Sequence, residues 1–285
     1  MIAVDMGGRL GNQLFIYAFA VSAAARLDCR FIVDFDFVNP HAFELPRFFE
    51  SPRFDGPWNR RRLSAYRAVR RMVPRVEIDS VTAPSVYTGK LRRFARYVGW
   101  MQSEEFFAPH QALVRQELTL RESVRRTFAD RYASRLCRMP TIVIHYRRTD
   151  YRKVGNPSLG LDMRLPHAYY DVCLARIPDL NKHQVFVVGD DLTAARAHYR
   201  GRDNFFFEEN EPIVDFQLLL AADTAIISNS SFAWWAAWLN PSRRPVFGPK
   251  HWLGFKAGSE WPAGITSQPW TWVDVPRYYV PEDHL

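Results

Sequence analysis

Between residues 141 and 247 of this 285-residue chain, short apolar segments alternate regularly with segments of helical spacing. The pattern predicts strands at 141–145, 184–188, 204–207, 225–228 and 245–247, and helices at 167–177, 192–199, 213–222 and 232–239. Strands separated by helices of this size form right-handed crossover units, which build a parallel sheet. The second half of the chain is therefore predicted to be a doubly wound α/β domain.

The start of the chain shows the same pattern. A strand is expected at residues 2–6, a glycine turn after it, a helix at 14–26 and a strand at 31–33. Prolines interrupt the segment from 39 to 138, where the pattern is weaker. We therefore expect two domains, 1–138, which contains an arginine-rich insertion, and 139–285.

Cysteine usage restricts the class of protein. Cys29, Cys137 and Cys173 are too far apart in the sequence for a zinc site and do not form a disulfide framework, which predicts a reduced, intracellular compartment. The apolar run 14–25 is interrupted on its N-terminal side by glycines and amides, so a signal peptide is not expected. The run 224–242 contains too many polar residues for a membrane span. A cytoplasmic location follows.

Ligands of open parallel sheets bind at the carboxyl ends of the strands, so the loops there are the candidate site. The first loop contains Gly8 and Gly11, which allow the backbone to approach a phosphate or sugar, followed by Asn12 and Gln13. The glycine spacing only approximates a dinucleotide fingerprint. The two amides suggest hydrogen bonding to a neutral polyol.

The second loop, 145–151, follows the strand 141–145 and contains His145, Arg147, Arg148 and Asp150. Two adjacent arginines can bind phosphate oxygens in a bidentate manner and neutralise a departing diphosphate without a metal ion. Asp150 either orients an arginine or accepts a proton. The alternative is an arginine paired with an interior carboxylate for structural reasons.

The third loop lies between a buried strand and a helix. Hydroxyls and free backbone N–H groups at a helix start hold phosphate but also cap the helix, so pure capping is the alternative. The candidate ligand-binding residues of this loop are Asn229, Ser230, Ser231 and Phe232.

Three acidic residues complete the candidate edge. Asp215 opens the preceding helix, where its carboxylate can accept both N1–H and N2–H of guanine, or can simply favour the helix dipole. Asp190 and Asp191 follow the strand 184–188, and one of them can cap the next helix.

Positive charge is concentrated in one segment. Residues 52–96 contain twelve Lys and Arg against three acidic residues, whereas the rest of the chain is close to neutral. Within this segment, apolar residues at helical spacing predict a basic amphipathic helix suited to an anionic membrane surface. These residues are Leu63, Tyr66, Val69, Met72 and Val73. A solvated helix face is the alternative, and a nucleic-acid surface is a third interpretation without a supporting motif.

An Asp-x-Asp sequence competes with the metal-free interpretation. Asp34 and Asp36 end an apolar strand, in the pattern with which many sugar transferases hold Mn²⁺ or Mg²⁺. The motif is short and common, so it gives a metal-dependent nucleotide-sugar transferase as an alternative.

Taken together, the loops resemble the α-1,2-fucosyltransferases. The likeness is carried, in the same order, by Gly8-Arg9-Leu10-Gly11-Asn12-Gln13-Leu14-Phe15, His145-Tyr146-Arg147-Arg148-Thr149-Asp150-Tyr151, Ser228-Asn229-Ser230-Ser231-Phe232-Ala233-Trp234-Trp235-Ala236-Ala237-Trp238-Leu239 and Gly248-Pro249-Lys250-His251-Trp252. The arginine-rich segment has no such likeness.

The resemblance implies a GT-B-like architecture, with two Rossmann-like doubly wound domains facing a central cleft, and inverting transfer of L-fucose from GDP-β-L-fucose to the 2-OH of a galactoside without a metal or other cofactor. Arg147 would bind the β-phosphate, His145 and Asp215 the guanosine, and Ser230 and Ser231 the diphosphate, while Asn12 and Gln13 would line the sugar side. Thr149, Gly189 and Ile16 depart from the family pattern.

The resemblance also implies the partners, and it implies that the first domain, 1–138, lies on the acceptor side. The donor is GDP-fucose, and the acceptor is a glycan that could be lipid-linked, which would explain a peripheral contact of the Arg60–Arg96 region with an anionic inner-membrane face. No nucleic-acid partner is expected. Asp150 is the candidate general base, a role that contributes about 10²–10⁴-fold to rate.

Overall fold

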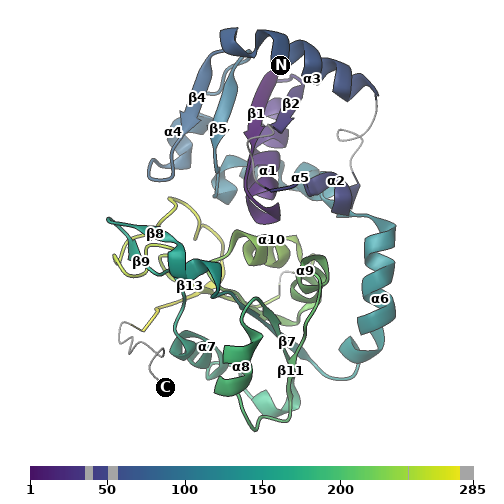
Figure 1. The fold of residues 1–285 in the computed structure, drawn as a ribbon, viewed down its shortest axis with the longest axis vertical. Helices are drawn as coiled ribbons and strands as arrows, with labels where there is room; N and C mark the ends of the chain where they lie inside the picture. Colours follow the sequence, from purple (N-terminus) through teal and green to yellow (C-terminus); the bar gives the residue numbers. More distant parts are fainter. Residues whose placement is uncertain (36–40, 51–56, 243, 277–285) are drawn as a thin grey trace. The chain divides into compact units, whose positions relative to one another are not determined.

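The computed structural model describes residues 1–35, 41–50, 57–242 and 244–276 (Figure 1). The chain forms two compact units. Unit 1 comprises Met1–Arg125 with Pro262–Gln268, and unit 2 comprises Arg126–Trp261 with Pro269–Leu285. Each unit is built around its own parallel sheet, as the sequence predicts for the second half and for the start of the first.

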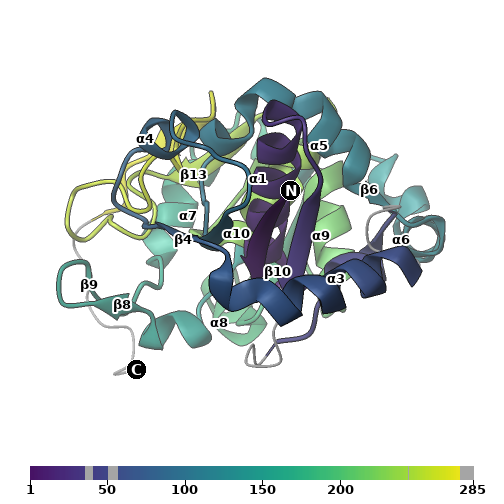
Figure 2. The ribbon, with the colours of Figure 1, turned by 90° about the horizontal axis from the view of Figure 1, so that it is seen from above.

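The main sheet of unit 1 has four parallel strands in the order β2-β1-β5-β4. These are β1 (Ile2–Met6), β2 (Phe31–Phe35), β4 (Arg75–Ile78) and β5 (Arg96–Gly99). Helix α1 (Leu10–Arg26) covers one face and α3 (Pro57–Val69) lies on the other (Figure 2). The predicted helix at 14–26 therefore begins four residues earlier, directly after the glycine turn.

The remainder of unit 1 consists of short elements around this sheet. The helices are α2 (Leu45–Phe48), α4 (Pro84–Thr88) and α5 (Gln111–Glu117), with 3₁₀ turns at Arg70–Met72, Glu104–Phe106 and Ala108–His110. Strands β3 (Phe49–Glu50) and β6 (Thr119–Leu120) pair antiparallel. The many prolines of this region explain why its elements are short.

The predicted basic helix is present, but most of its apolar residues face its own sheet. Tyr66 is buried with Ala3 and Ile32, and Leu63 and Val73 pack against the same cluster. The interpretation of this stripe as a free membrane-binding face is therefore corrected, because hydrophobic periodicity shows that a face is covered without showing what covers it. Val69 and Met72 remain exposed, at 45% and 84%.

Two arginines of this helical segment form ion pairs and hydrogen bonds with β1 and β2. Arg67 donates to Asp34 at 3.0 Å and to the Phe35 carbonyl at 2.7 Å. Arg70 pairs with Asp34 at 3.2 Å and with Asp5 at 3.3 Å. Part of the positive charge of the segment therefore neutralises buried carboxylates of the sheet.

The sheet of unit 2 has six parallel strands in the order β11-β10-β7-β12-β13-β14. Their bounds are β7 (Thr141–Tyr146), β10 (Gln184–Gly189), β11 (Phe205–Phe207), β12 (Thr224–Ile226), β13 (Val246–Pro249) and β14 (Thr271–Val273). The first five match the predicted strands within two residues at each end, whereas β14 is not predicted. A small hairpin of β8 (Gly155–Asn156) and β9 (Gly160–Leu161) follows β7.

Helices cover both faces of this sheet. Helices α7 (His167–Leu174) and α8 (Leu192–His198) contribute Tyr169, Tyr170 and Tyr199 with neighbouring residues to a core that includes Ile142 and Val185. On the other side lie α9 (Pro212–Ala221) and α10 (Ser231–Leu239) (Figure 1). Alternate residues of β7 therefore face opposite layers, as in other doubly wound sheets.

Helix α6 (Glu122–Leu136) contains the division between the two units, which falls between Arg125 and Arg126. The Tyr132 hydroxyl donates to Glu208 at 2.7 Å, and Arg135 pairs with the same carboxylate at 2.6 Å. These contacts attach most of the helix to unit 2, where residues 208–210 follow β11. No helix in the described ranges is long and apolar enough to cross a bilayer.

Candidate functional site

The candidate site of unit 2 lies where the winding of its sheet reverses. After β7 the chain continues to β10 and β11 on one side, then returns to β12 on the other side of β7. Ligands of doubly wound sheets bind at such a switch point, beyond the carboxyl ends of the strands. The loops after β7, β10 and β12 therefore share one edge, and these loops contain most of the predicted site residues.

Arg147 follows β7 and is held by carboxylates. Its Nε donates to Asp150 Oδ1 at 2.9 Å, its second nitrogen contacts the other oxygen of Asp150, and Nε lies 3.4 Å from Asp190 Oδ2. The guanidinium also lies over the Tyr151 ring, 5.4 Å from its centroid. Arg147 therefore has the carboxylate pairing of the structural alternative. Its side chain is also 18% exposed at the ligand edge, which leaves it accessible to a phosphate.

Asp190 organises the loop after β7. Its Oδ1 accepts from the Arg148 backbone N–H at 2.7 Å, and its Oδ2 accepts from the Thr149 hydroxyl at 2.7 Å. The Thr149 hydroxyl thus adds a side-chain hydrogen bond to the backbone contact made by Arg148. Gly189 is required before Asp190, because its φ is +137° and a Cβ there would lie 2.1 Å from the Tyr146 carbonyl oxygen.

Arg148 is placed differently from the prediction. Its side chain is only 4% exposed, donates to the Leu165 carbonyl at 2.9 Å and lies 3.4 Å from Asp191. The guanidinium is also 5.7 Å from the Tyr146 ring centroid. This arrangement fits a residue that fixes the loop from inside better than the expected donor contact.

His145 is buried one residue before the end of β7. Its Nδ1 lies 2.7 Å from Ser228 Oγ, and its ring is 5.7 Å from the Phe232 ring. Burial, assisted by the positive charge of Arg147, lowers the pKa of His145 to about 3. A neutral ring can bind a nucleoside by packing or by a hydrogen bond but does not act as a general acid at neutral pH.

Helix capping accounts for only part of the hydrogen bonding of the loop 228–231. Ser230 occupies the N-cap position of α10, but its side chain makes no capping hydrogen bond. Asn229 donates to the Met163 carbonyl at 2.9 Å, and its buried Oδ1 has no hydrogen-bond partner among the described residues. The Tyr151 hydroxyl donates to the Asn229 carbonyl at 2.9 Å, which joins the loops after β7 and β12. These observations disfavour capping as the whole purpose of the Ser-Asn-Ser-Ser run.

Asp215 lies in the first turn of α9 and is buried. Asn210 donates to its Oδ1 at 3.0 Å, and burial raises the pKa of Asp215 to about 7, with the nearby Glu208 adding to the rise. A carboxylate that is costly to ionise and has one free oxygen fits a polar ligand group. The sequence indicates Asp215 but not Asn210 and Glu208, because nothing in the local sequence of those two residues shows that they face this helix.

Asp191 is the residue of the pair 190–191 that caps the next helix, as the sequence predicts for one of the two. Its side chain accepts from the Ala194 N–H at 3.2 Å and caps α8. Asp190 is left to organise the loop after β7.

Gln13, which the resemblance places on the sugar side, lies in the glycine loop of unit 1. Gln13 is fully buried, donates to the carbonyls of Gly8 and Ala42 at 2.9 and 2.8 Å, and accepts from the Glu44 N–H at 2.9 Å. The Glu44 carboxylate accepts from the Leu10 N–H at 2.7 Å, at the start of α1. A negative charge therefore already lies at this helix terminus, and the polar atoms of the Gln13 side chain bond to the backbone of the loop and of residues 42 and 44.

The other residues of this loop remain compatible with a ligand. Gly8 has a φ of +69°, and a Cβ there would lie 2.5 Å from Asn12 Nδ2. Gly11 lies inside α1. Asn12 is half-buried, and its Oδ1 accepts from Gln102 Nε2 at 2.7 Å.

The Asp-x-Asp alternative is not supported by the position of Asp34. Its buried carboxylate is paired with Arg67 and Arg70, a cationic environment that opposes metal binding. Asp36 lies outside the described residues. Among the residues that the structure describes, no group of three or more His, Cys, Asp or Glu side chains is arranged to hold a metal.

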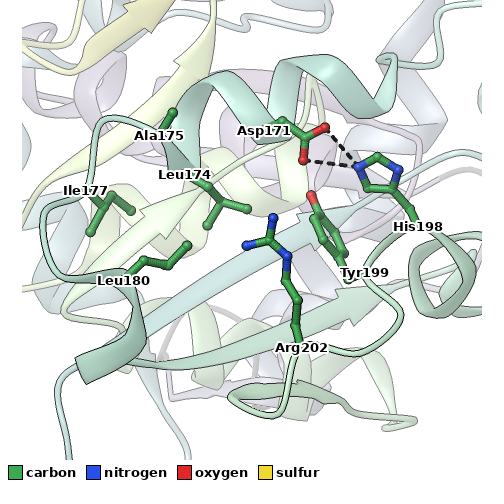
Figure 3. Close-up of a pocket in the computed structure, with 8 residues that line it drawn as sticks. All are labelled: Asp171, Leu174, Ala175, Ile177, Leu180, His198, Tyr199 and Arg202. Carbon is green, nitrogen blue, oxygen red and sulfur yellow. Dashed lines mark hydrogen bonds and ion pairs between the residues drawn. The ribbon is translucent and has the colours of Figure 1, made fainter.

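A separate pocket of about 380 Å³ lies between α7 and α8 (Figure 3). The Asp171 carboxylate and His198 point toward each other at 2.9 Å, next to Tyr199 and Arg202. Leu180, on its wall, accepts a hydrogen bond from Asn204, which precedes β11. The pocket is therefore near the amino ends of the strands, away from the candidate edge.

Known proteins resemble this chain over most of its length. It is 23% identical to an alpha-1,2-colitosyltransferase of Escherichia coli over 259 residues, 84% of this chain and 87% of that protein. It is 31% identical to the O-antigen biosynthesis glycosyltransferase WbnK of Escherichia coli over 120 residues, 40% of this chain and only 39% of WbnK.

A solved structure shows the same fold. NodZ, an alpha-1,6-fucosyltransferase from Bradyrhizobium, aligns in a crystal soaked with GDP-fucose with a TM-score of 0.51 and 19% identity, over 84% of this chain and 92% of NodZ. The predicted fold class, α/β of the GT-B type with two doubly wound units, is thereby confirmed.

Residues 87–247 match the family described as glycosyl transferase family 11. The match covers more than half of the chain and contains β7, β10, β12 and every loop of the candidate site in unit 2. The chain therefore belongs to glycosyl transferase family 11.

Proposed function

We propose that the protein transfers L-fucose from GDP-β-L-fucose to the 2-OH of a galactoside, with inversion and without a metal ion. The observation that supports this most is Arg147, which Asp150 and Asp190 hold at the switch point. The NodZ structure soaked with GDP-fucose has the same fold and indicates which class of donor to test.

The proposed reaction is a single in-line displacement. The acceptor O2 forms a bond to fucose C1 while the bond from C1 to the β-phosphate oxygen breaks, and GDP takes the bonding electrons. Arg147 and the N–H groups at the start of α10 would stabilise the developing charge on the diphosphate. Preorganised donors of this kind contribute about 2.7–4 kcal/mol each in other enzymes.

The acceptor proton requires a base. Asp150 is still a candidate, because its side chain is 42% exposed at this edge. Its two contacts with the Arg147 guanidinium make its primary role the positioning of that group. In a loose transition state the proton on O2 becomes acidic only late, so either a carboxylate such as Asp150 or solvent water can accept it.

The guanine would be bound by Asp215. One oxygen of this carboxylate accepts from Asn210, which leaves the other for guanine N1–H and N2–H. His145, held neutral by burial, would pack against the nucleoside. Both residues belong to elements that reach the same edge of the sheet.

A direct test uses GDP-fucose with a panel of neutral β-galactosides, with and without EDTA. We expect a fucosylated product whose linkage is α-1,2 by NMR, formed equally in both conditions. Loss of product in EDTA would instead favour the metal-dependent alternative. Colitose differs from L-fucose by the absence of the 3-hydroxyl, so a parallel reaction with a 3-deoxy donor tests whether the sugar resembles that named for the E. coli relative.

We also propose that the protein docks peripherally on the cytoplasmic face of an anionic membrane, through the amino edge of the sheet of unit 1. Phe94 is 70% exposed and Met72 is 84% exposed. The Phe94 N–H donates to the Met1 carbonyl at 2.7 Å, and the Arg96 N–H donates to the Pro74 carbonyl at 2.9 Å, so the starts of β1, β5 and β4 lie side by side. An exposed aromatic and a methionine at one sheet edge fit the interface of a bilayer.

Positive charge surrounds these two apolar residues in the sequence segments at that edge. Exposed cations there are Arg71, Arg75, Lys90, Arg92 and Arg93. Each basic residue near an anionic surface contributes about 1 kcal/mol. This surface replaces the helix stripe that the sequence suggested.

Vesicle co-sedimentation tests the surface. The protein should bind phosphatidylcholine vesicles that contain phosphatidylglycerol, salt should weaken the binding, and Phe94→Ser or Met72→Ser should reduce it. Val81→Ser is the matched control, because Val81 is 72% exposed and follows the opposite end of β4. Equal binding by Phe94→Ser, or binding of duplex DNA that Phe94→Ser leaves unchanged, would contradict the proposal.

A further inference from the structure

The carboxyl edge of the sheet of unit 1 carries an exposed tryptophan. Trp100 directly follows β5 and is 42% exposed. A Cβ placed on Gly7, which directly follows β1, would lie 3.6 Å from the Trp100 ring, so the indole lies beside the glycine loop. The two strands are neighbours in the sheet. An exposed indole at this position needs an explanation other than core packing.

The backbone around Trp100 is constrained. Gly99 has a φ of +151°, and a Cβ there would lie 2.1 Å from the Ile78 carbonyl oxygen, so only glycine fits. Met101 is buried at 2% exposure and has a φ of +47°, a left-handed conformation that is unfavourable for a non-glycine residue. Strained backbone persists where the surrounding structure enforces it and is common at binding sites. The turn keeps Met101 inside and leaves the indole at the surface.

Two neutral amides belong to the segments that meet at this edge, Asn12 in the first turn of α1 and Gln102 two residues after Trp100. Gln102 Nε2 donates to Asn12 Oδ1 at 2.7 Å, which joins the turn after β5 to the first turn of α1. Both side chains are half-buried. Amide groups both donate and accept hydrogen bonds, as the hydroxyls of a neutral sugar require. An aromatic face with adjacent amides is suited to a pyranose ring, whose C–H face is apolar and whose rim is polar.

We propose that Trp100, with Asn12 and Gln102, forms a binding site for a neutral pyranose ring of the acceptor glycan. The proposal rests on the proposed glycosyl transfer and adds the residues that select the acceptor. The C–H face of the sugar would lie on the indole, and its hydroxyls would bond to the two amides.

The test separates acceptor binding from donor binding. With the wild-type protein, GDP release from GDP-fucose in the absence of acceptor reports the donor site, and the KM for the best β-galactoside reports the acceptor site. Trp100→Ala should raise the acceptor KM by about tenfold, the equivalent of a lost aromatic contact, and leave GDP affinity unchanged. Trp100→Phe should recover most of the loss.

Val81→Ala is the matched control. Val81 is an exposed apolar residue that follows β4 in the same sheet and belongs to neither proposed binding surface, so its replacement should leave the acceptor KM unchanged. An unchanged acceptor KM in Trp100→Ala, with wild-type transfer intact, would overturn this inference alone. Absence of both GDP binding and transfer in the wild-type protein would overturn the proposed function instead.

Discussion

The Nδ1 atom of His145, in β7, lies 2.7 Å from Oγ of Ser228, in the loop that follows β12. Both residues are buried, at 3% and 0% exposure, so the contact connects two neighbouring strand ends inside unit 2. It fixes the ring that we assign to the nucleoside and the start of the loop that we assign to the diphosphate. The two predicted motifs thus meet through a hydrogen bond that no sequence pattern specifies.

Removing the Ser228 hydroxyl should destabilise the fold. In Ser228→Ala the imidazole nitrogen is left buried without its partner, which costs about 1–3 kcal/mol. Thermal unfolding should show a lower Tm, and Ser85→Ala, at an exposed side chain, should not change it. An unchanged Tm in Ser228→Ala would mean that the contact contributes nothing to stability.

The pair Arg147 and Asp150 should behave as one unit in donor binding. Arg147→Ala removes the diphosphate contact, and Asp150→Asn removes the bidentate hold on the guanidinium, so both should weaken GDP binding, the first by about tenfold or more. Isothermal titration calorimetry with GDP measures this. If Asp150→Asn lowers kcat by about a hundredfold or more and leaves GDP affinity intact, Asp150 is the general base and not a positioning residue.

GDP binding should depend on pH through Asp215. The pKa of this carboxyl is raised to about 7 by burial, and guanine N–H donors require its ionised form, so GDP affinity should rise as pH increases from 6 to 8. Fold stability should change in the opposite direction, because a carboxyl with a raised pKa stabilises the fold when protonated and loses that contribution as pH rises through about 7. Asp215→Asn should bind GDP weakly and without this pH dependence. A pH-dependent affinity that persists in Asp215→Asn would assign the effect to another group.

Gln13 should act on stability rather than on the donor. Gln13→Ala removes three hydrogen bonds that hold the glycine loop and residues 42–44 together, with an expected loss of about 1–3 kcal/mol and a lower Tm. GDP affinity should be unchanged. Glu44→Gln keeps the side-chain shape and the backbone bond to Gln13 but removes the charge at the start of α1, so it separates the effect of that charge from the effect of the Gln13 hydrogen bonds. A wild-type Tm with abolished transfer in Gln13→Ala would restore the sugar-side role expected from the sequence.

The sequence predicted the parallel sheet of unit 2 because its strands are continuous apolar runs, such as 141–146, buried on both faces. Strands β4 and β5 were missed because Arg75, Glu77 and Arg96 interrupt their apolar pattern. β14 has only three residues in a tryptophan-rich segment, which leaves no periodicity to detect.

The candidate site was only partly predictable for a different reason. Residue type and strand-end position indicated Arg147, Asp215 and Ser230. Whether an arginine or an amide faces solvent or the interior depends on residues distant in sequence, such as Leu165 for Arg148 and Glu44 for Gln13. The exposure of Trp100 likewise depends on the left-handed backbone at Met101, which the sequence does not signal.

The central claim is that unit 2 binds a guanine nucleotide through side chains and helix N–H groups rather than through a cation. The most direct measurement is the Tm of the full chain with GDP, UDP, ADP or NAD, in the presence of EDTA. A ligand at 100 times its Kd stabilises the folded state by about 2.7 kcal/mol, so GDP should raise the Tm measurably and Arg147→Ala should abolish the shift. An equal shift with UDP or ADP, or a GDP shift that requires Mg²⁺ or Mn²⁺, would contradict the account.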